Sequence, residues 1–291
     1  MALTAVLMFG AGCSGDQVGA MQVEERPAGS GLRAGHLEDE IVCGAWTERI
    51  LTALWRLLAG WPDESRVAGL AGVERVSFET ADQRRLGGYR LRAYADWSLP
   101  PRGYVLIGPG NAMLADQVVG EFAFLQAAGF DVYVYDHRGY GISEGKSRFA
   151  AIRADYVAII EQLNGRGYHN HFLYGMSIGG VFMLNAIGAG VGYDAALIDS
   201  PPSRISDHGC PARFDPVANV PQDAARLGFI FGHRDTVVPP GAWRELAALA
   251  RERGAVVVER ADLAHPLMDR APAAHRTRMT ILRAFFTDRA R

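Results

Sequence analysis

Three residues with side chains suited to nucleophilic chemistry, Ser177, Asp235 and His265, each follow a short apolar run. Ser177 lies in Gly-Met-Ser-Ile-Gly (175–179), directly after HFLYG and before a helical pattern. Glycines on both sides of a serine permit a sharp strand-to-helix turn that raises the hydroxyl above a sheet. Asp235 follows RLGFIFG, and His265 follows AVVVER. A histidine oriented by a carboxylate can take the serine proton as the serine oxygen attacks a carbonyl.

Each of these residues also has a simpler interpretation. Ser177 can cap the helix that follows it, Asp235 can occupy an ordinary turn, and His265 can be an exposed loop residue. His275 is an alternative base, although the pattern places it inside the last helix. The position of all three residues after separate apolar runs, in the order Ser, Asp, His, favours a nucleophile with its base.

The elements that must position these residues alternate along the chain. VERVSFET and YRLRAYA alternate in polarity and predict an antiparallel strand pair. Further strands are predicted at 104–108, 131–136, 171–175, 195–200, 226–232 and 255–260. Helices are predicted at 114–128, 149–163, 178–189, 242–253 and 272–287. This alternation predicts an α/β fold with a mostly parallel sheet covered on both faces, whose strand ends carry the chemistry.

The GMSIGG turn, the Ser-Asp-His order and YDHRGYGISEG (135–145) resemble the α/β-hydrolase superfamily, close to its small esterase, lipase and serine-aminopeptidase-like branches. The resemblance covers residues 73–287. It implies an eight-stranded, mostly parallel sheet with an antiparallel N-terminal pair, and a catalytic triad of Ser177, Asp235 and His265. Arg138 and the glycines of YDHRGYGISEG are interpreted as scaffold, so Ser143 is not the predicted nucleophile.

The predicted oxyanion hole uses two backbone N–H groups. Ile178 supplies one at the start of the helix, where free N–H groups and the helix dipole favour negative charge. The resemblance assigns the second to Asn111, in the loop Gly-Pro-Gly-Asn-Ala (108–112), where Pro109 replaces the usual histidine. The loss of one such donor typically lowers the rate by about 10²- to 10³-fold.

The first 15 residues resemble a signal segment, and the Gly-Ala-Gly-Cys ending resembles a lipobox with Cys13 as the lipidated residue. This predicts a bacterial cell-envelope or exported protein. The alternative is a cytoplasmic protein with a frayed N-terminus or a misassigned start. In an oxidising compartment the other two cysteines, Cys43 and Cys210, are able to pair.

Residues 16–72 are interpreted as a linker plus an amphipathic helix at 41–61, followed by a catalytic domain at 73–291. The helix either packs on that domain, shields a substrate entrance or lies on a membrane surface. Glu48, Arg49 and Arg56 argue against a membrane-spanning helix. The region between Ser200 and Leu227, which usually inserts a cap, is short, so the cap is predicted to be reduced or absent.

The composition is that of a folded protein, with 49% hydrophobic and 21% charged residues among 291. The formal net charge of −2 gives no reason to expect a nucleic-acid partner. The cysteine spacing matches no metal site, and the predicted chemistry needs no cofactor or metal. We therefore predict a serine hydrolase that cleaves a carboxylic ester or a related acyl bond of a small molecule. The alternatives are a serine peptidase, an acyltransferase and a non-catalytic envelope binding protein.

Overall fold

The computed structural model describes residues 36–44, 48, 52–93 and 100–290. All of them belong to one compact unit, Leu32–Arg291. The predicted signal segment, Cys13 and most of the predicted linker lie outside the described residues.

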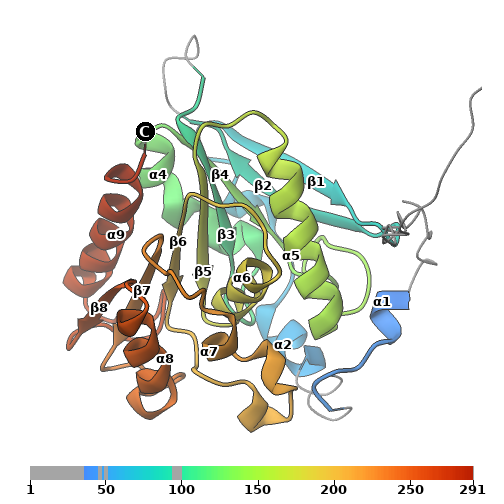
Figure 1. The fold of residues 1–291 in the computed structure, drawn as a ribbon. Helices are drawn as coiled ribbons and strands as arrows, with labels where there is room; N and C mark the ends of the chain where they lie inside the picture. The colour runs from blue at the N-terminus through green and yellow to red at the C-terminus, as the bar shows by residue number, and fades with distance from the viewer. Residues whose placement is uncertain (1–35, 45–47, 49–51, 94–99, 291) are drawn as a thin grey trace, which may run out of the picture. The chain divides into compact units, whose positions relative to one another are not determined.

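The described residues form an eight-stranded sheet in the order β1-β2-β4-β3-β5-β6-β7-β8 (Figure 1). β1 pairs with β2 and β2 with β4 in antiparallel fashion, and every other neighbouring pair is parallel. This confirms the predicted fold. The strands are β1 (Val73–Glu79), β2 (Arg85–Leu91), β3 (Gly103–Gly108), β4 (Phe130–Tyr135), β5 (His171–Met176), β6 (Ala195–Asp199), β7 (Leu227–Gly232) and β8 (Val256–Arg260).

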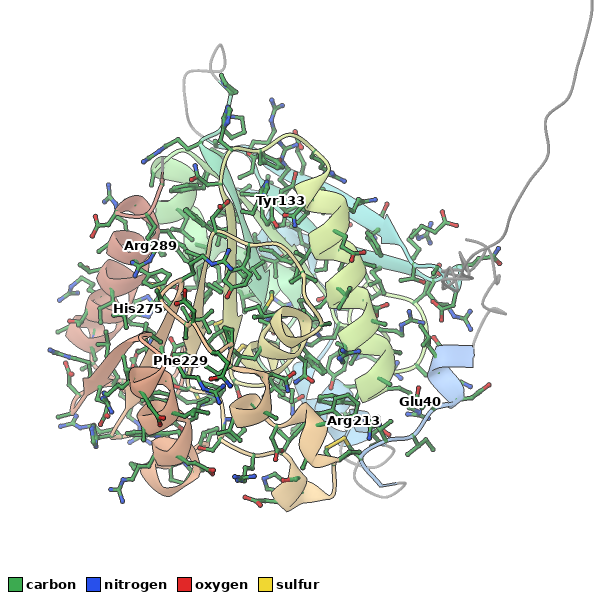
Figure 2. All side chains as sticks on the ribbon, in the orientation of Figure 1. Glu40, Tyr133, Arg213, Phe229, His275 and Arg289 are labelled. Atoms are coloured by element: carbon green, nitrogen blue, oxygen red, sulfur yellow. A yellow bond between two sulfur atoms is a disulfide. The ribbon has the colours of Figure 1, made fainter. Side chains whose placement is uncertain are left out.

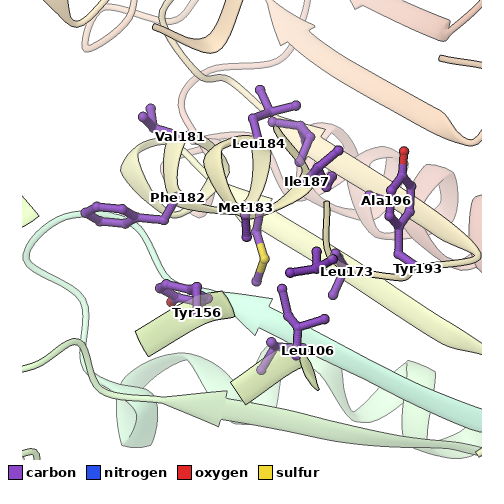
Figure 3. Close-up of a cluster of buried hydrophobic side chains, with 14 of the residues drawn as sticks. Leu106, Tyr156, Leu173, Val181, Phe182, Met183, Leu184, Ile187, Tyr193 and Ala196 are labelled. Atoms are coloured by element: carbon purple, nitrogen blue, oxygen red, sulfur yellow. The ribbon is translucent and has the colours of Figure 1, made fainter. Parts of the chain in front are cut away.

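Helices cover both faces of this sheet. The buried side chains of α5, α6 and α8 belong to one hydrophobic cluster, and those of α3, α4 and α9 belong to the other. Figure 3 shows part of the first cluster, where Met183 points from α6 toward Leu106 and Leu173 of the sheet. The helices are α1 (His36–Asp39), α2 (Thr52–Ala59), α3 (Ala115–Val118), α4 (Ala123–Ala127), α5 (Phe149–Asn164), α6 (Ile178–Gly188), α7 (Pro216–Asn219), α8 (Pro240–Glu252) and α9 (Pro272–Thr287), with short 3₁₀ turns η2 (Glu64–Arg66), η3 (Val119–Phe122), η4 (Ser206–His208) and η5 (Ala212–Phe214).

The burial pattern explains why the sequence predicts the positions of the central strands. Every residue of β3, β4, β6 and β7 is buried, as expected for parallel strands covered on both faces. The strand β8 lies at the sheet edge, where its three middle residues are half-buried and its two end residues are exposed. The continuous apolar runs therefore report the buried centre of the sheet.

Two element boundaries differ from the sequence prediction. The second strand begins at Arg85 rather than at Tyr89, because Arg85–Gly88 pair with Val76–Glu79 of β1 across the hairpin. The predicted helix at 114–128 is divided into α3, η3 and α4. Gly120, a poor helix former, lies in the 3₁₀ turn between the two short α-helices.

The N-terminal part of the described chain is joined to the sheet domain by covalent and ionic links. A disulfide connects Cys43 to Cys210. Glu38 of α1 accepts a hydrogen bond from the fully buried Arg138, which also pairs with Asp82 and Asp155. Arg138 therefore ties three distant segments together, as its scaffold interpretation predicts.

The helix predicted at 41–61 is observed as α2, which is shorter, and part of the predicted range lies outside the described residues. Its C-terminal end leaves Leu57, Leu58 and Trp61 exposed. Among the helices that the structure describes, none has the length and apolar content to cross a membrane.

Candidate active site

Ser177 lies in a strained turn between β5 and α6. Its backbone has φ 53° and ψ −120°, an unfavourable conformation for a residue with a β-carbon. The turn is held from both sides. The Ser177 N–H donates to the Asp199 carbonyl at the end of β6 (2.8 Å), and a β-carbon at Gly175 would lie 2.6 Å from the Gly180 Cα atom. The two-glycine pattern therefore reflects close backbone packing beneath the serine.

The Ser177 side chain does not cap the helix that follows it. The structure shows no hydrogen bond from its hydroxyl to the first turn of α6, although Ser177 occupies the N-cap position. The residue is 8% exposed. This geometry argues against the simpler interpretation of the serine and leaves its hydroxyl available for chemistry.

Asp235 and His265 form a buried hydrogen-bonded pair. The His265 Nδ1 atom lies 2.7 Å from Asp235 Oδ2, and both side chains are buried. The other carboxylate oxygen of Asp235 accepts the backbone N–H groups of Val237 and Val238, at 2.9 and 2.8 Å. Because an ionised carboxylate only accepts, Nδ1 carries the proton and Nε2 presents its lone pair.

The structure brings Asp235 and His265 together, but it shows no hydrogen bond between His265 Nε2 and Ser177 Oγ. Among the described residues, the His265 ring bonds only to Asp235. Such contacts are often long in the absence of substrate and tighten when it binds. His275, the alternative base, lies on α9 (Figure 2), and its Nε2 atom is 3.3 Å from Glu121 Oε2. It is not the histidine that Asp235 orients.

A buried arginine that the sequence analysis missed links the serine turn to the histidine loop. Arg278 of α9 donates to both Asp199 oxygens at 2.5 and 2.6 Å, to Asp269 at 2.8 Å and to the Ala264 carbonyl at 2.5 Å. Asp199 holds the Ser177 N–H through its backbone, and Ala264 precedes His265. The arginine therefore fixes two parts of the site relative to each other.

The spacing of residues in the last helix indicates that this arginine is buried. Ala274, Arg278 and Leu282 recur every four residues on one face of α9 and are all buried. A charged residue at a core position of a helix indicates a buried partner. Asp199 also stands at a strand end, but its two oxygens are occupied by Arg278, Tyr174 and Ser200 rather than by a histidine.

The loop after β3 packs directly against the serine turn. A β-carbon at Gly179 would lie 2.2 Å from the Gly108 carbonyl oxygen and 2.5 Å from that of Pro109. The backbone N–H groups of Ile178 and Asn111 have no hydrogen-bond partner among the described residues. The two predicted donors therefore lie on adjoining backbone segments.

His137, which the sequence analysis also missed, holds the loop after β3 in place through a side-chain hydrogen bond. Its Nε2 atom donates to the Pro109 carbonyl at 3.1 Å, and its Nδ1 atom accepts from the Tyr156 hydroxyl at 3.3 Å. Burial lowers the pKa of His137 to about 4, although the bond to Pro109 opposes this shift. A neutral ring suits this role, because Nδ1 must remain an acceptor.

His137 predicts a specific pH dependence of stability. From pH 6.5 down to about 4 the unfolded chain binds a proton at this histidine and the folded protein does not, so the contribution of the neutral ring falls as pH falls. The free energy of unfolding of the wild type, relative to His137→Gln, is expected to drop by about 2–3 kcal/mol between pH 7 and pH 4.5. Urea unfolding at both pH values measures it.

Burial also raises the pKa of both Asp136 and Asp155 to about 6, but these groups are present in both proteins and cancel in the difference. A difference between wild type and His137→Gln that stays constant over this pH range would contradict the assignment of a buried neutral His137.

A cavity of about 300 Å³ opens beside the predicted oxyanion positions. Asn111 and Ile178 line it, as do Phe149, Phe182 and both cysteines of the disulfide. Ser177 and His265 are not among its lining residues. No group of three or more metal-binding side chains occurs within the described residues.

Comparison with known proteins places these features in context. Residues 99–220 match the model of the family described as serine aminopeptidase, S33. This range includes Asn111, Ser177 and Ile178 and ends before Asp235 and His265. The uncharacterized protein YfhR of Escherichia coli K12 is 29% identical over 132 residues, which are 44% of this chain and 46% of YfhR. The match thus spans less than half of that relative.

Solved structures share the fold over a larger part of the chain. The Pyrococcus furiosus esterase Pf2001 superposes with a TM-score of 0.62 at 16% identity, covering 75% of this chain and 93% of the esterase. An esterase domain from a Rhodothermus marinus protein superposes with a TM-score of 0.58 at 18% identity, covering 75% of this chain and all of the domain. At this level of identity the likeness shows the fold alone.

Proposed function

We propose that this chain is an α/β-hydrolase and, within that superfamily, a serine hydrolase that cleaves a carboxylic ester or a related acyl bond. The observation that carries the proposal is the buried Asp235–His265 hydrogen bond at the same sheet edge as the strained Ser177 turn. A carboxylate-oriented histidine next to a raised serine is the arrangement that activates a hydroxyl for attack on a carbonyl.

In the proposed reaction, Ser177 Oγ attacks the carbonyl carbon as His265 Nε2 takes the serine proton. Asp235 stabilises the imidazolium, and the N–H groups of Ile178 and Asn111 bind the oxyanion. Collapse of the tetrahedral intermediate breaks the bond to the leaving alcohol, which receives the proton from His265. Water then attacks the acyl-enzyme by the same route in reverse and releases the acid and free Ser177.

A serine peptidase remains the second candidate, and the match of residues 99–220 to the serine aminopeptidase family favours it. The same triad and oxyanion hole would serve an amide bond, and an acyltransferase would use them with a different acceptor. The leaving group, not the catalytic residues, distinguishes these reactions.

Hydrolysis of p-nitrophenyl acetate and butyrate, compared with leucine p-nitroanilide, tests the proposal. We expect the esters to turn over and the anilide to be hydrolysed far more slowly. Faster cleavage of the anilide would favour the peptidase. If neither class is hydrolysed and a fluorophosphonate leaves the protein unmodified, the non-catalytic binding protein is the better account.

A further inference from the structure

We infer that the cavity beside Asn111 and Ile178 is the acyl-chain pocket, and that the Cys43–Cys210 disulfide forms a wall that limits the length of the chain it accepts. This inference rests on the proposed function. It names a substrate class for the same site, namely esters of unbranched acids of short to medium length.

The position of the cavity indicates which part of an ester enters it. The carbonyl carbon of an ester carries two substituents, the acyl chain and the alkoxy group. The alkoxy oxygen must face His265, because it leaves with the proton that this histidine carries. The cavity is lined by Asn111 and Ile178, the residues of the two proposed oxyanion donors, and neither Ser177 nor His265 is among its lining residues. The substituent that extends into it is therefore the acyl chain.

The chemistry of the lining suits an alkyl chain. Phe149, Ile152, Phe182 and Ile205 contribute apolar side chains, and the rings of Phe149 and Phe182 lie 4.9 Å apart. Two of the polar side chains that line the cavity, His137 and Glu48, are already hydrogen-bonded to other groups of the protein. His137 bonds to Pro109 and Tyr156, and the Glu48 carboxylate accepts the backbone N–H groups of Val42 and Phe149.

The disulfide joins a residue from outside the sheet domain to the wall of the cavity. Cys43 belongs to the segment that precedes α2, whereas Cys210 belongs to the loop after β6, and 167 residues separate them. Both cysteines line the cavity, and Cys43 is buried. The bond fixes these two segments to each other where they line the cavity, so the wall does not move aside for a longer chain.

The size of the cavity sets the expected chain length. A volume of about 300 Å³ equals the space that about ten water molecules occupy in the liquid, at roughly 30 Å³ each. A methylene group is of similar size, so the pocket holds fewer than about ten carbons at ordinary packing density. We expect kcat/KM to rise from acetyl to about octanoyl esters, by up to about fourfold per methylene, and to fall at least tenfold by palmitoyl.

The experiment compares p-nitrophenyl esters of C2 to C16 acids among wild type, Ile205→Phe, Ile205→Ala and the double variant Cys43→Ala/Cys210→Ala. We expect Ile205→Phe to move the optimum to shorter chains, and Ile205→Ala to move it to longer ones. The double variant is expected to lose most of the decline at C12–C16. Ile187→Ala is the matched control, since Ile187 is a buried isoleucine outside the cavity lining.

A second series holds the acid at C8 and varies the alcohol. The inference would be overturned if the dependence of kcat/KM on acyl-chain length had the same shape in all variants. It would also be overturned if the variants changed the preference for the alcohol and not for the acid. If the double variant fails to fold, the opposite shifts of the two Ile205 variants still show whether the cavity holds the acyl chain. A loss of stability would instead lower activity on all chain lengths alike. Ser177-dependent acetate hydrolysis with an unresponsive profile would remove this inference and leave the proposed function intact.

Discussion

Ser177→Ala is expected to lower kcat/KM for p-nitrophenyl butyrate by about 10⁴- to 10⁶-fold, because the variant loses the atom that forms the acyl-enzyme. The residual rate reflects the oxyanion hole and substrate binding alone. Ser177 makes no side-chain cap bond, so its hydroxyl contributes little to stability. The thermal unfolding midpoint of the variant should therefore be close to that of the wild type.

The matched control is Ser143→Ala, in the segment YDHRGYGISEG that the sequence analysis interprets as scaffold. The Ser143 hydroxyl donates to the Asp136 carbonyl at 2.7 Å and accepts the Gly87 N–H at 3.0 Å. Its removal is expected to cost about 1 kcal/mol of stability and to leave catalysis nearly unchanged. Equal losses of activity in the two variants would mean that Ser177 acts through the fold rather than as the nucleophile.

The second large effect is expected for His265→Ala, with a fall in kcat/KM of about 10⁴- to 10⁶-fold. The variant keeps Ser177 and the oxyanion donors but has no group that accepts the serine proton. Added imidazole is expected to restore part of the activity, since it supplies a base to the space that the side chain leaves. A steady-state assay with and without imidazole measures both effects.

His275→Ala is the control for this variant. His275 is the alternative histidine in sequence, but it lies on α9 beside Glu121. Its replacement is expected to change kcat/KM by less than about threefold, because partly exposed polar contacts of this kind contribute little. A large loss in His275→Ala together with a small one in His265→Ala would reverse the assignment of the base.

Most of the sheet could be predicted from the sequence, because its strands are buried on both faces. The runs HFLYG and RLGFIFG correspond to β5 and β7 within one residue at each end. The first hairpin was placed less well. Arg85 belongs to β2, although its charge and the neighbouring glycines are typical of a turn. The boundary of β2 is set by its pairing with β1, and the local amino-acid composition gives no sign of this pairing.

The residues at strand ends could be predicted for a similar reason, since parallel strands bring their carboxyl ends to one edge of the sheet. The groups that hold them could not. Arg278 reaches Asp199 across 79 residues of sequence, and His137 reaches Pro109 across 28. Such partners depend on how α9 and the loop after β4 pack against the sheet. For Arg278, the charge on the buried face of α9 is a signal in the sequence; His137 has no comparable signal.

The pairing of Cys43 with Cys210 was an open question in the sequence for the same reason. Two cysteines far apart in a chain give no indication of their distance in space. The fold places the segment before α2 beside the loop after β6, and this proximity makes the bond feasible. A cavity whose wall comes from both segments is likewise a property of the tertiary structure alone.

The most direct test of the central claim is to locate the residue that a fluorophosphonate modifies. Intact mass measurement and peptide mapping of the wild type are expected to show one adduct, on the peptide that contains Ser177, and none in Ser177→Ala. An activated serine reacts rapidly with such a probe, whereas an ordinary surface hydroxyl does not. Modification at another residue, equal modification of Ser177→Ala, or no reaction of the folded wild type would contradict the assignment of Ser177 as the nucleophile.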